Sequence, residues 1–185
     1  MTPMFGIIAS QISGHLASPT SYESIATVTV GSGGLSSISV SSIPSTFKHL
    51  QIRGIGRGSG SNNTLITING ASSVYNSHWL EGNGSSASAG ADTTSNGIWA
   101  FNATGGSNSL SNTFGASVID ILDYADTNKY KTLRILNGVD FNGSGYIDFQ
   151  SGLYRQTTAI SSITLTPSSG TVAQYSQFAL YGIKG

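Results

Sequence analysis

The segment YESIATVTVGSGGLSSISV, residues 22–40, carries the clearest secondary-structure signal in the chain. Hydrophobic residues alternate with threonines from Ala26 to Val30, and a period of two residues is typical of a strand with one buried face. A glycine-rich run, residues 31–34, interrupts this pattern before alternation resumes at Ile38. Two such strands joined by a short glycine-rich loop predict a β-hairpin.

Similar short runs follow along the rest of the chain. Residues 114–124 form a continuous apolar run, which predicts a central strand buried on both faces. Residues 81–111 are mostly small and polar and predict a long excursion that contains one strand. No period of 3.6 residues lasts long enough for a helix. Roughly ten short strands at even spacing therefore predict an all-β, antiparallel sandwich or barrel. The further predicted strands cover residues 45–54, 65–69, 75–80, 97–101, 130–136, 146–154, 160–165 and 177–183.

The first twenty residues differ from the remainder of the chain. They show neither a helical nor a strand period, so we expect 1–20 to be an irregular arm and 21–185 to be a single β-sandwich domain. The apolar part of this arm has no basic region before it and is too short for a secretory signal, which favours a docking segment. Its candidate docking residues are Met4, Phe5, Ile7 and Ile8.

The composition excludes several classes of function. Only 9% of the residues are charged, against roughly 25% in an average soluble domain. The net charge is zero and the eight basic residues are dispersed, so no nucleic-acid partner is expected. The longest apolar runs fall well below the ~18 residues of a membrane span, so no membrane partner is expected either. The chain has no cysteine, which excludes disulfides, and its low charge favours association with other chains.

Catalytic and metal-binding patterns are weak in this sequence. The histidines His15, His49 and His78 have no metal-ligand spacing, so we expect neither a metal nor another cofactor. Five aspartates could supply the paired carboxylates of a glycosidase, but aspartate is also common in turns, which is the interpretation we favour. The five aspartates are Asp120, Asp123, Asp126, Asp140 and Asp148. The sequence thus predicts that the protein is not an enzyme.

Aromatic residues cluster around the polar excursion. Such side chains can be core anchors beneath a long loop, or they can stack on a sugar ring, and the sequence leaves both interpretations open. We therefore treat one set of residues as candidate glycan or receptor contacts. This set comprises Tyr75, His78, Trp79, Trp99 and Phe101.

Three pairs of segments resemble small structural proteins of tailed phages of aquatic bacteria, cyanophages among them. The resemblance implies a jelly-roll-like β-sandwich, a homotrimer and a place in the virion as a tail-fibre or capsid-decorating protein. The segments are YESIATVTVG (22–31) with SIPSTFKHLQIR (42–53), VIDILDY (118–124) with NKYKT (128–132), and SSITL (161–165) with QFALYGIKG (177–185).

The leading functional hypothesis is therefore a structural virion protein whose N-terminal arm binds other capsid or tail proteins and whose loops face the host. The alternative is a host-glycan-binding module used in adsorption. A polysaccharide depolymerase is a third and weaker candidate, because the carboxylate pattern is also explained by turns.

Overall fold

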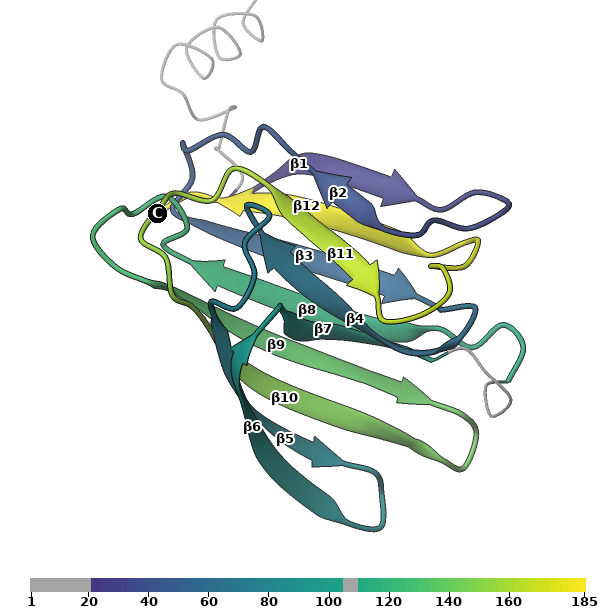
Figure 1. Ribbon diagram of the computed structural model, residues 1–185. Helices are drawn as coiled ribbons and strands as arrows, with labels where there is room; N and C mark the ends of the chain where they lie inside the picture. The colour runs from purple at the N-terminus through teal and green to yellow at the C-terminus, as the bar shows by residue number, and fades with distance from the viewer. Residues whose placement is uncertain (1–20, 105–109) are drawn as a thin grey trace, which may run out of the picture.

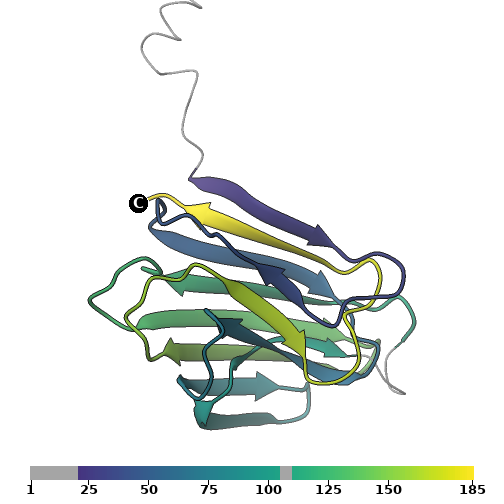
Figure 2. The same ribbon diagram turned by 45° about the horizontal axis from the view of Figure 1, so that its top comes forward.

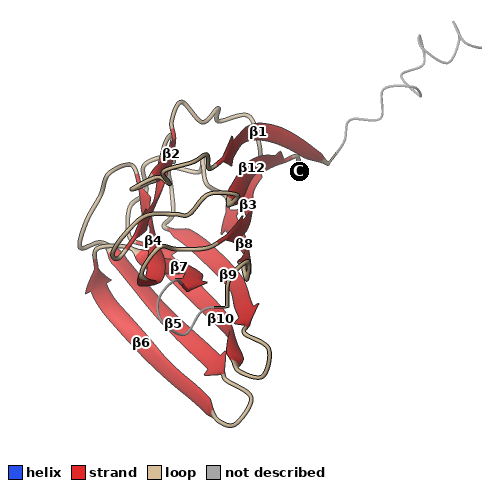
Figure 3. Ribbon diagram, turned by 90° about the vertical axis from the view of Figure 1, so that its right-hand side faces the viewer, coloured by secondary structure: helices blue, strands red, loops and turns tan. Residues whose placement is uncertain are grey.

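The computed structural model describes residues 21–104 and 110–185, without the side chains of residues 61, 62, 94 and 101–104. The described part of the chain forms twelve strands and no helix, so the all-β prediction is confirmed (Figure 3). The strands are β1 (Tyr22–Thr29), β2 (Ile38–Val40), β3 (His49–Gly56), β4 (Ser61–Ile68), β5 (Tyr75–Gly82), β6 (Ala87–Ser95), β7 (Ile98–Thr104), β8 (Gly115–Leu122), β9 (Lys131–Asp140), β10 (Gly145–Tyr154), β11 (Ile163–Pro167) and β12 (Gln177–Ile183).

The strands form two antiparallel sheets that face each other (Figure 1). The large sheet has the order β1-β12-β3-β8-β9-β10-β5-β6, and the small sheet has the order β2-β11-β4-β7. The predicted antiparallel β-sandwich is thereby confirmed, whereas the jelly-roll strand order implied by the resemblance is not. Because the large sheet has twice as many strands, its β10-β5-β6 end continues past the small sheet (Figure 1).

The hairpin predicted for residues 22–40 is wrong. Strand β1 pairs with β12 in the large sheet, and β2 pairs with β11 in the small sheet. Between them, the amide of Val30 donates to the carbonyl of Ser176 at 2.8 Å, and Leu35 forms a bridge with Val172. A glycine-rich loop can close a hairpin or carry the chain from one sheet to the other, and here pairing with the C-terminal strands decides the outcome.

Two further predictions are corrected by the structure. The segment 81–111 was expected to hold one strand, but it contains the end of β5, all of β6 and all of β7. Strand β8 was expected to be buried on both faces, yet Val118 is 38% exposed while Ile119 and Ile121 are buried. Strand β8 is central, but the small sheet covers only one of its faces, so its alternate side chains remain at the surface.

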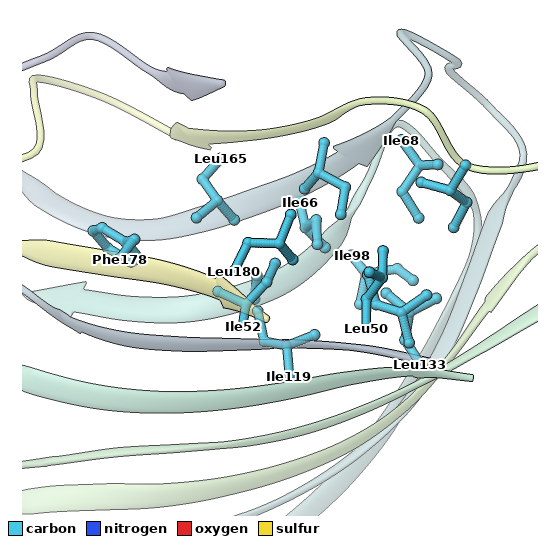
Figure 4. Close-up of a cluster of buried hydrophobic side chains, with 14 of the residues drawn as sticks. Leu50, Ile52, Ile66, Ile68, Ile98, Ile119, Leu133, Leu165, Phe178 and Leu180 are labelled. Atoms are coloured by element: carbon cyan, nitrogen blue, oxygen red, sulfur yellow. The ribbon is translucent and has the colours of Figure 1, made fainter. Parts of the chain in front are cut away.

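The hydrophobic core lies between the two sheets. Isoleucine and leucine side chains from β3, β8, β9 and β12 of the large sheet meet those from β4, β7 and β11 of the small sheet (Figure 4). Ile66, Ile98 and Leu133 are fully buried there. Each buried aliphatic side chain of this kind stabilises the fold by roughly 1.5–3 kcal/mol, so this layer holds the sheets together.

Polar groups close one end of the core. The hydroxyl of Tyr75 accepts from the amide of Ile68 at 2.7 Å and donates to its carbonyl at 3.2 Å, and its ring stacks on Tyr154 with centroids 5.3 Å apart. The fully buried ammonium of Lys131 donates to three backbone carbonyls, those of residues 126, 129 and 157. These bonds satisfy backbone groups at the end of β4 and in the loops, which would otherwise be left without a partner next to the core.

The expected arm, residues 1–20, lies outside the described residues, as do its candidate docking residues Met4, Phe5, Ile7 and Ile8. The described chain begins at the edge strand β1, which runs beside β12 (Figure 2). The amide of Lys184 donates to the carbonyl of Ser21 at 3.1 Å, so the two ends of the described chain meet. No described helix is long and apolar enough to cross a membrane.

Candidate functional site

A pocket of about 230 Å³ opens where the large sheet extends past the small sheet. We call it the tryptophan pocket. Strands β5, β6 and β10 of the large sheet supply one wall, and β4 and β7 of the small sheet supply the other. Its volume is below the ~300–1,000 Å³ of pockets for drug-sized ligands, and suits a ligand of about one sugar ring. The pocket is lined by Asn63, Trp79, Glu81, Asp92, Trp99, Asp148 and Gln150.

The pocket wall is polar because the strand pattern is inverted on β10. Ile147 and Phe149 point outward and are more than half exposed, while Asp148 and Gln150 point inward and are buried. In register, Asp148 lies opposite Glu81 and Gln150 lies opposite Trp79 on the neighbouring strand. Tyr154 of β10 and Tyr75 of β5 still belong to the hydrophobic core, and a polar surface continues from them along the same face of these two strands.

One row of inward residues shows the change from an apolar to a polar surface. This row crosses five strands in register and contains only small or polar side chains. It runs from the sheet centre to the edge as Ser117, Asn137, Asp148, Glu81 and Ser88. Because buried polar groups require hydrogen bonds, a group that fills the pocket beside this row must form hydrogen bonds with it.

Trp79 lies flat against the edge strand. A methyl group built on Gly90 would lie 2.4 Å from Cζ2 and 2.7 Å from Cε2 of the Trp79 ring, well inside van der Waals contact. Only glycine at position 90 allows the indole to occupy this place, and the register sets Gly90 directly opposite Trp79. The ring is thus held against β6 and forms a fixed aromatic wall of the pocket.

Asp148 is the centre of the polar wall. Its Oδ2 accepts hydrogen bonds from Nδ2 of Asn137, at 3.2 Å, and from Nε2 of Gln150. Asp148 is 4% exposed and Gln150 is 2% exposed. Within the described part of the chain, no donor forms a hydrogen bond with Oδ1 of Asp148 or Oε1 of Gln150. Two buried acceptors without a hydrogen bond cost about 1–3 kcal/mol each, so this polar wall is retained at a cost in stability.

The carboxylates make this region electronegative. Burial first, and then the neighbouring charges of Glu81 and Asp148, raise the pKa of Tyr146 to about 12. The third pocket carboxylate, Asp92, has a long contact of 3.5 Å from the hydroxyl of Ser77. Among the described residues, no set of three or more histidine, aspartate or glutamate side chains is arranged to hold a metal ion.

The structure divides the residues predicted as glycan or receptor contacts. Trp79 and Trp99, on opposite sheets, are brought together in the pocket. Tyr75 is fully buried and supports the core, which places it out of reach of a ligand. His78 is exposed on the opposite face of the large sheet. Phe101 is part of β7, opposite Thr64, but its side chain lies outside the described residues.

Sequence reasoning missed most of the polar pocket residues. Glu81, Asp92 and Gln150 were not singled out, and Asp148 was considered only as one of five aspartates explained by turns. The detectable signal was in residues 146–154, where aspartate and glutamine alternate with exposed isoleucine and phenylalanine. That alternation indicates two faces but not which of them points inward.

The other predicted carboxylates lie elsewhere. Asp123 pairs with the ammonium groups of Lys48, at 2.8 Å, and Lys129. The hydrogen bond from Lys129, which has the larger effect, and the one from Lys48 lower the pKa of Asp123 to about 2. Asp120 accepts from the side chain of Gln51 at 2.7 Å. Both are engaged in structural contacts away from the tryptophan pocket.

The outer surface of the large sheet carries an exposed apolar patch, which we call the outer apolar face. Four of its side chains lie in cross-strand register from β8 to β5, in the order Val118, Leu136, Phe149 and Leu80. A shallow groove of about 730 Å³ borders the patch. All members are between 38% and 60% exposed. They are Ile55, Leu80, Val118, Leu136, Ile147 and Phe149.

Comparison with protein-family models, curated proteins and solved structures gives no significant match for this chain.

Proposed function

We propose that this protein is a non-enzymatic, glycan-binding β-sandwich of a tailed-phage particle, which contacts host surface polysaccharide during adsorption. The tryptophan pocket supports the glycan-binding part of the proposal. It combines two indole rings with carboxylate acceptors, and a sugar offers both an apolar C–H face and hydroxyl donors. The virion location and the binding of other virion proteins by the N-terminal arm are supported by the sequence resemblance alone.

Binding of purified protein to host polysaccharide tests the proposal. Trp79→Ala and Trp99→Ala should each weaken binding by about tenfold or more, because each removes aromatic area from the pocket wall. Tyr175→Ala is the matched control, since Tyr175 is 72% exposed and is not part of the pocket. Thermal melts confirm that each variant is folded. Equal binding by folded wild type and both tryptophan variants would contradict the proposal.

The same samples separate binding from hydrolysis. The proposal expects polysaccharide to be retained without the release of reducing ends. Release of reducing ends by wild type, abolished in Asp148→Asn or Glu81→Gln, would instead identify a depolymerase. That result would assign these carboxylates the acid and nucleophile or base roles of a glycosidase.

Particle assembly is a second candidate function, and the outer apolar face favours it. Exposed apolar patches of this kind mark interaction surfaces in soluble proteins. A row of side chains in register across four strands presents a flat apolar strip that a second copy of this chain could cover. The proposed assembly is a homotrimer in which the outer apolar face contacts neighbouring copies, leaving the arm for contacts with other virion proteins.

Mass photometry tests the assembly proposal. We expect wild type and a chain lacking residues 1–20 to be trimers, and Phe149→Ser to be monomeric. Tyr130→Ser is the matched control, because Tyr130 is also 52% exposed but lies outside the outer apolar face. A monomeric wild type, or a trimer that Phe149→Ser leaves intact, would refute this role for the face.

A further inference from the structure

The tryptophan pocket has an excess of negative charge and of hydrogen-bond acceptors. Three of its seven lining residues, Glu81, Asp92 and Asp148, are carboxylates, and none of the seven is basic. The ion pairs found in the described part of the chain involve other acidic residues, Glu23, Asp123 and Asp126. A ligand that enters this pocket therefore meets acidic groups that form no ion pair with the described basic residues.

The most buried acceptors are also the least satisfied. Oδ2 of Asp148 holds the amide donors of Asn137 and Gln150, which fixes the orientation of the glutamine amide. The oxygen of that amide, Oε1 of Gln150, and Oδ1 of Asp148 then remain as buried acceptors without a hydrogen bond from the described residues. Both side chains are more than nine-tenths buried and line the pocket. The site thus requires a donor-rich group, and preferably one with a positive charge.

An ammonium group meets both requirements. It carries three donors and no acceptor, and it is attracted to the face of an indole ring as well as to a carboxylate. A metal ion is a poorer match, because the described acidic side chains form no cluster suited to a metal. An acidic sugar would add a fourth negative charge to a small, partly desolvated pocket, which is unfavourable.

Resting on the proposed glycan-binding function, we propose that the tryptophan pocket selects a sugar unit with a free amino group, a hexosamine that is not N-acetylated. Its ammonium lies among the carboxylates of Glu81, Asp92 and Asp148, and its ring packs against the indole of Trp79. Glucose-like neutral sugars bind more weakly, and uronic acids bind least. N-acetylation weakens binding because it removes the charge and two of the three donors.

Isothermal titration of the full chain with four methyl glycosides tests the inference. The ligands are the methyl glycosides of glucosamine, N-acetylglucosamine, glucose and glucuronic acid, at about pH 6, where such an amine is protonated. We expect the glucosaminide to bind at least about tenfold more tightly than the glucoside, the effect of one charge-assisted hydrogen bond in a buried site. Methylammonium alone should bind far more weakly than the glucosaminide, because it lacks the ring.

Asp148→Asn sharpens the test. The asparagine oxygen can replace Oδ2 as acceptor for Asn137 and Gln150, and the substitution removes one of the three carboxylate charges of the pocket. The preference for glucosaminide over glucoside should then fall while the variant remains folded. Asp140→Asn is the matched control, because it removes the same charge from an exposed residue outside the tryptophan pocket, whose Oδ1 accepts from the amide of Asn142. We expect it to retain the wild-type preference.

The outcomes separate the two proposals. If none of the sugars binds and host polysaccharide is also not retained, the proposed glycan-binding function itself fails. If polysaccharide is retained but the four glycosides bind equally, or the glucuronide binds best, selection of an amino sugar is wrong and glycan binding stands. If methylammonium binds as tightly as the glucosaminide, the assignment of a sugar ring to the pocket is wrong. If calcium alone binds tightly, the assignment of an ammonium group is wrong.

Discussion

Replacing Gly90 with alanine tests the geometry of the tryptophan pocket without a ligand. The added methyl group would lie 2.4 Å from Cζ2 and 2.7 Å from Cε2 of Trp79, and 3.1 Å from its Nε1. Non-bonded carbon atoms prefer separations of about 3.5–4.0 Å, so the indole or the edge strand must move by about 1 Å or more. Three contacts on one ring leave the indole little room for a small rotation.

The size of the effect follows from this displacement. Forcing an extra methyl group into a well-packed contact costs about 1–3 kcal/mol. Strand β6 is an edge strand and can shift more easily than a central strand, so we expect a loss near the lower end of that range. For a chain of this size, each kcal/mol lowers the melting temperature by about 2–4 °C. The displaced indole should also weaken binding of the glucosaminide and glucoside alike.

Calorimetry and near-ultraviolet circular dichroism measure these effects. Gly82→Ala is the matched control, because a methyl group there would meet only Cγ2 of Ile147, at an ordinary 3.9 Å. Gly90→Ala should melt lower than the control and should change the tryptophan signal. If both variants have the same melting temperature and the same tryptophan signal, the indole does not lie on Gly90 and the pocket wall described above is wrong.

Three further predictions concern the polar end of the core and the Asp123 cluster. Tyr75→Phe leaves the buried amide of Ile68 in β4 without its acceptor, so the free energy of unfolding measured in urea should fall by about 1–3 kcal/mol. An unchanged urea midpoint would refute this role of the hydroxyl. Lys131→Met leaves three carbonyls without a donor and should cost about 3 kcal/mol or more, and a variant as stable as wild type would contradict this. Hydrogen bonds from Lys129 and, second, from Lys48 lower the pKa of Asp123 to about 2 in the folded protein, below its value in the unfolded chain. The contribution of Asp123 to the stability of the fold is therefore present above about pH 4 and is lost as the pH falls from about 4 to 2. Urea midpoints should fall less over that range in Asp123→Asn than in wild type, and parallel curves would exclude the effect.

Local alternation was enough to find strands but not to place them. Residues 177–183 were predicted as a strand from their alternation and match β12. The pairing of β1 was predicted wrongly, because its true partner β12 lies at the far end of the sequence. No local pattern distinguishes a glycine-rich hairpin from a connection between sheets when each strand buries only one face.

Strand β6 shows a second limit of the sequence signal. Its residues, ASAGADTTS, carry no large apolar side chains and were assigned to a long excursion. The strand forms because β5 offers its backbone for pairing and because Gly90 provides space for the indole of Trp79. Both causes depend on a neighbouring strand, so composition alone predicts a loop here.

The candidate site was predictable only in part. Aromatic clustering pointed to Trp79 and Trp99, and the structure brings them together. The same reasoning also selected Tyr75 and His78, which lie in the core and on the opposite face of the sheet. Spacing along a strand determines which side chains share a face, but the extent of the covering sheet determines whether that face is core, pocket or surface.

The pairing of the first strand with the last has a consequence for synthesis on the ribosome. Thr29 and Gln177, which are joined by a side-chain hydrogen bond, lie 148 residues apart. At about 5–20 residues per second, β1 waits roughly 7–30 seconds before its partner is translated. During this time its backbone donors and acceptors are open to nascent chains on neighbouring ribosomes. A more hydrophobic strand would promote aggregation during this delay. The serine and threonine residues of β1 lower that tendency.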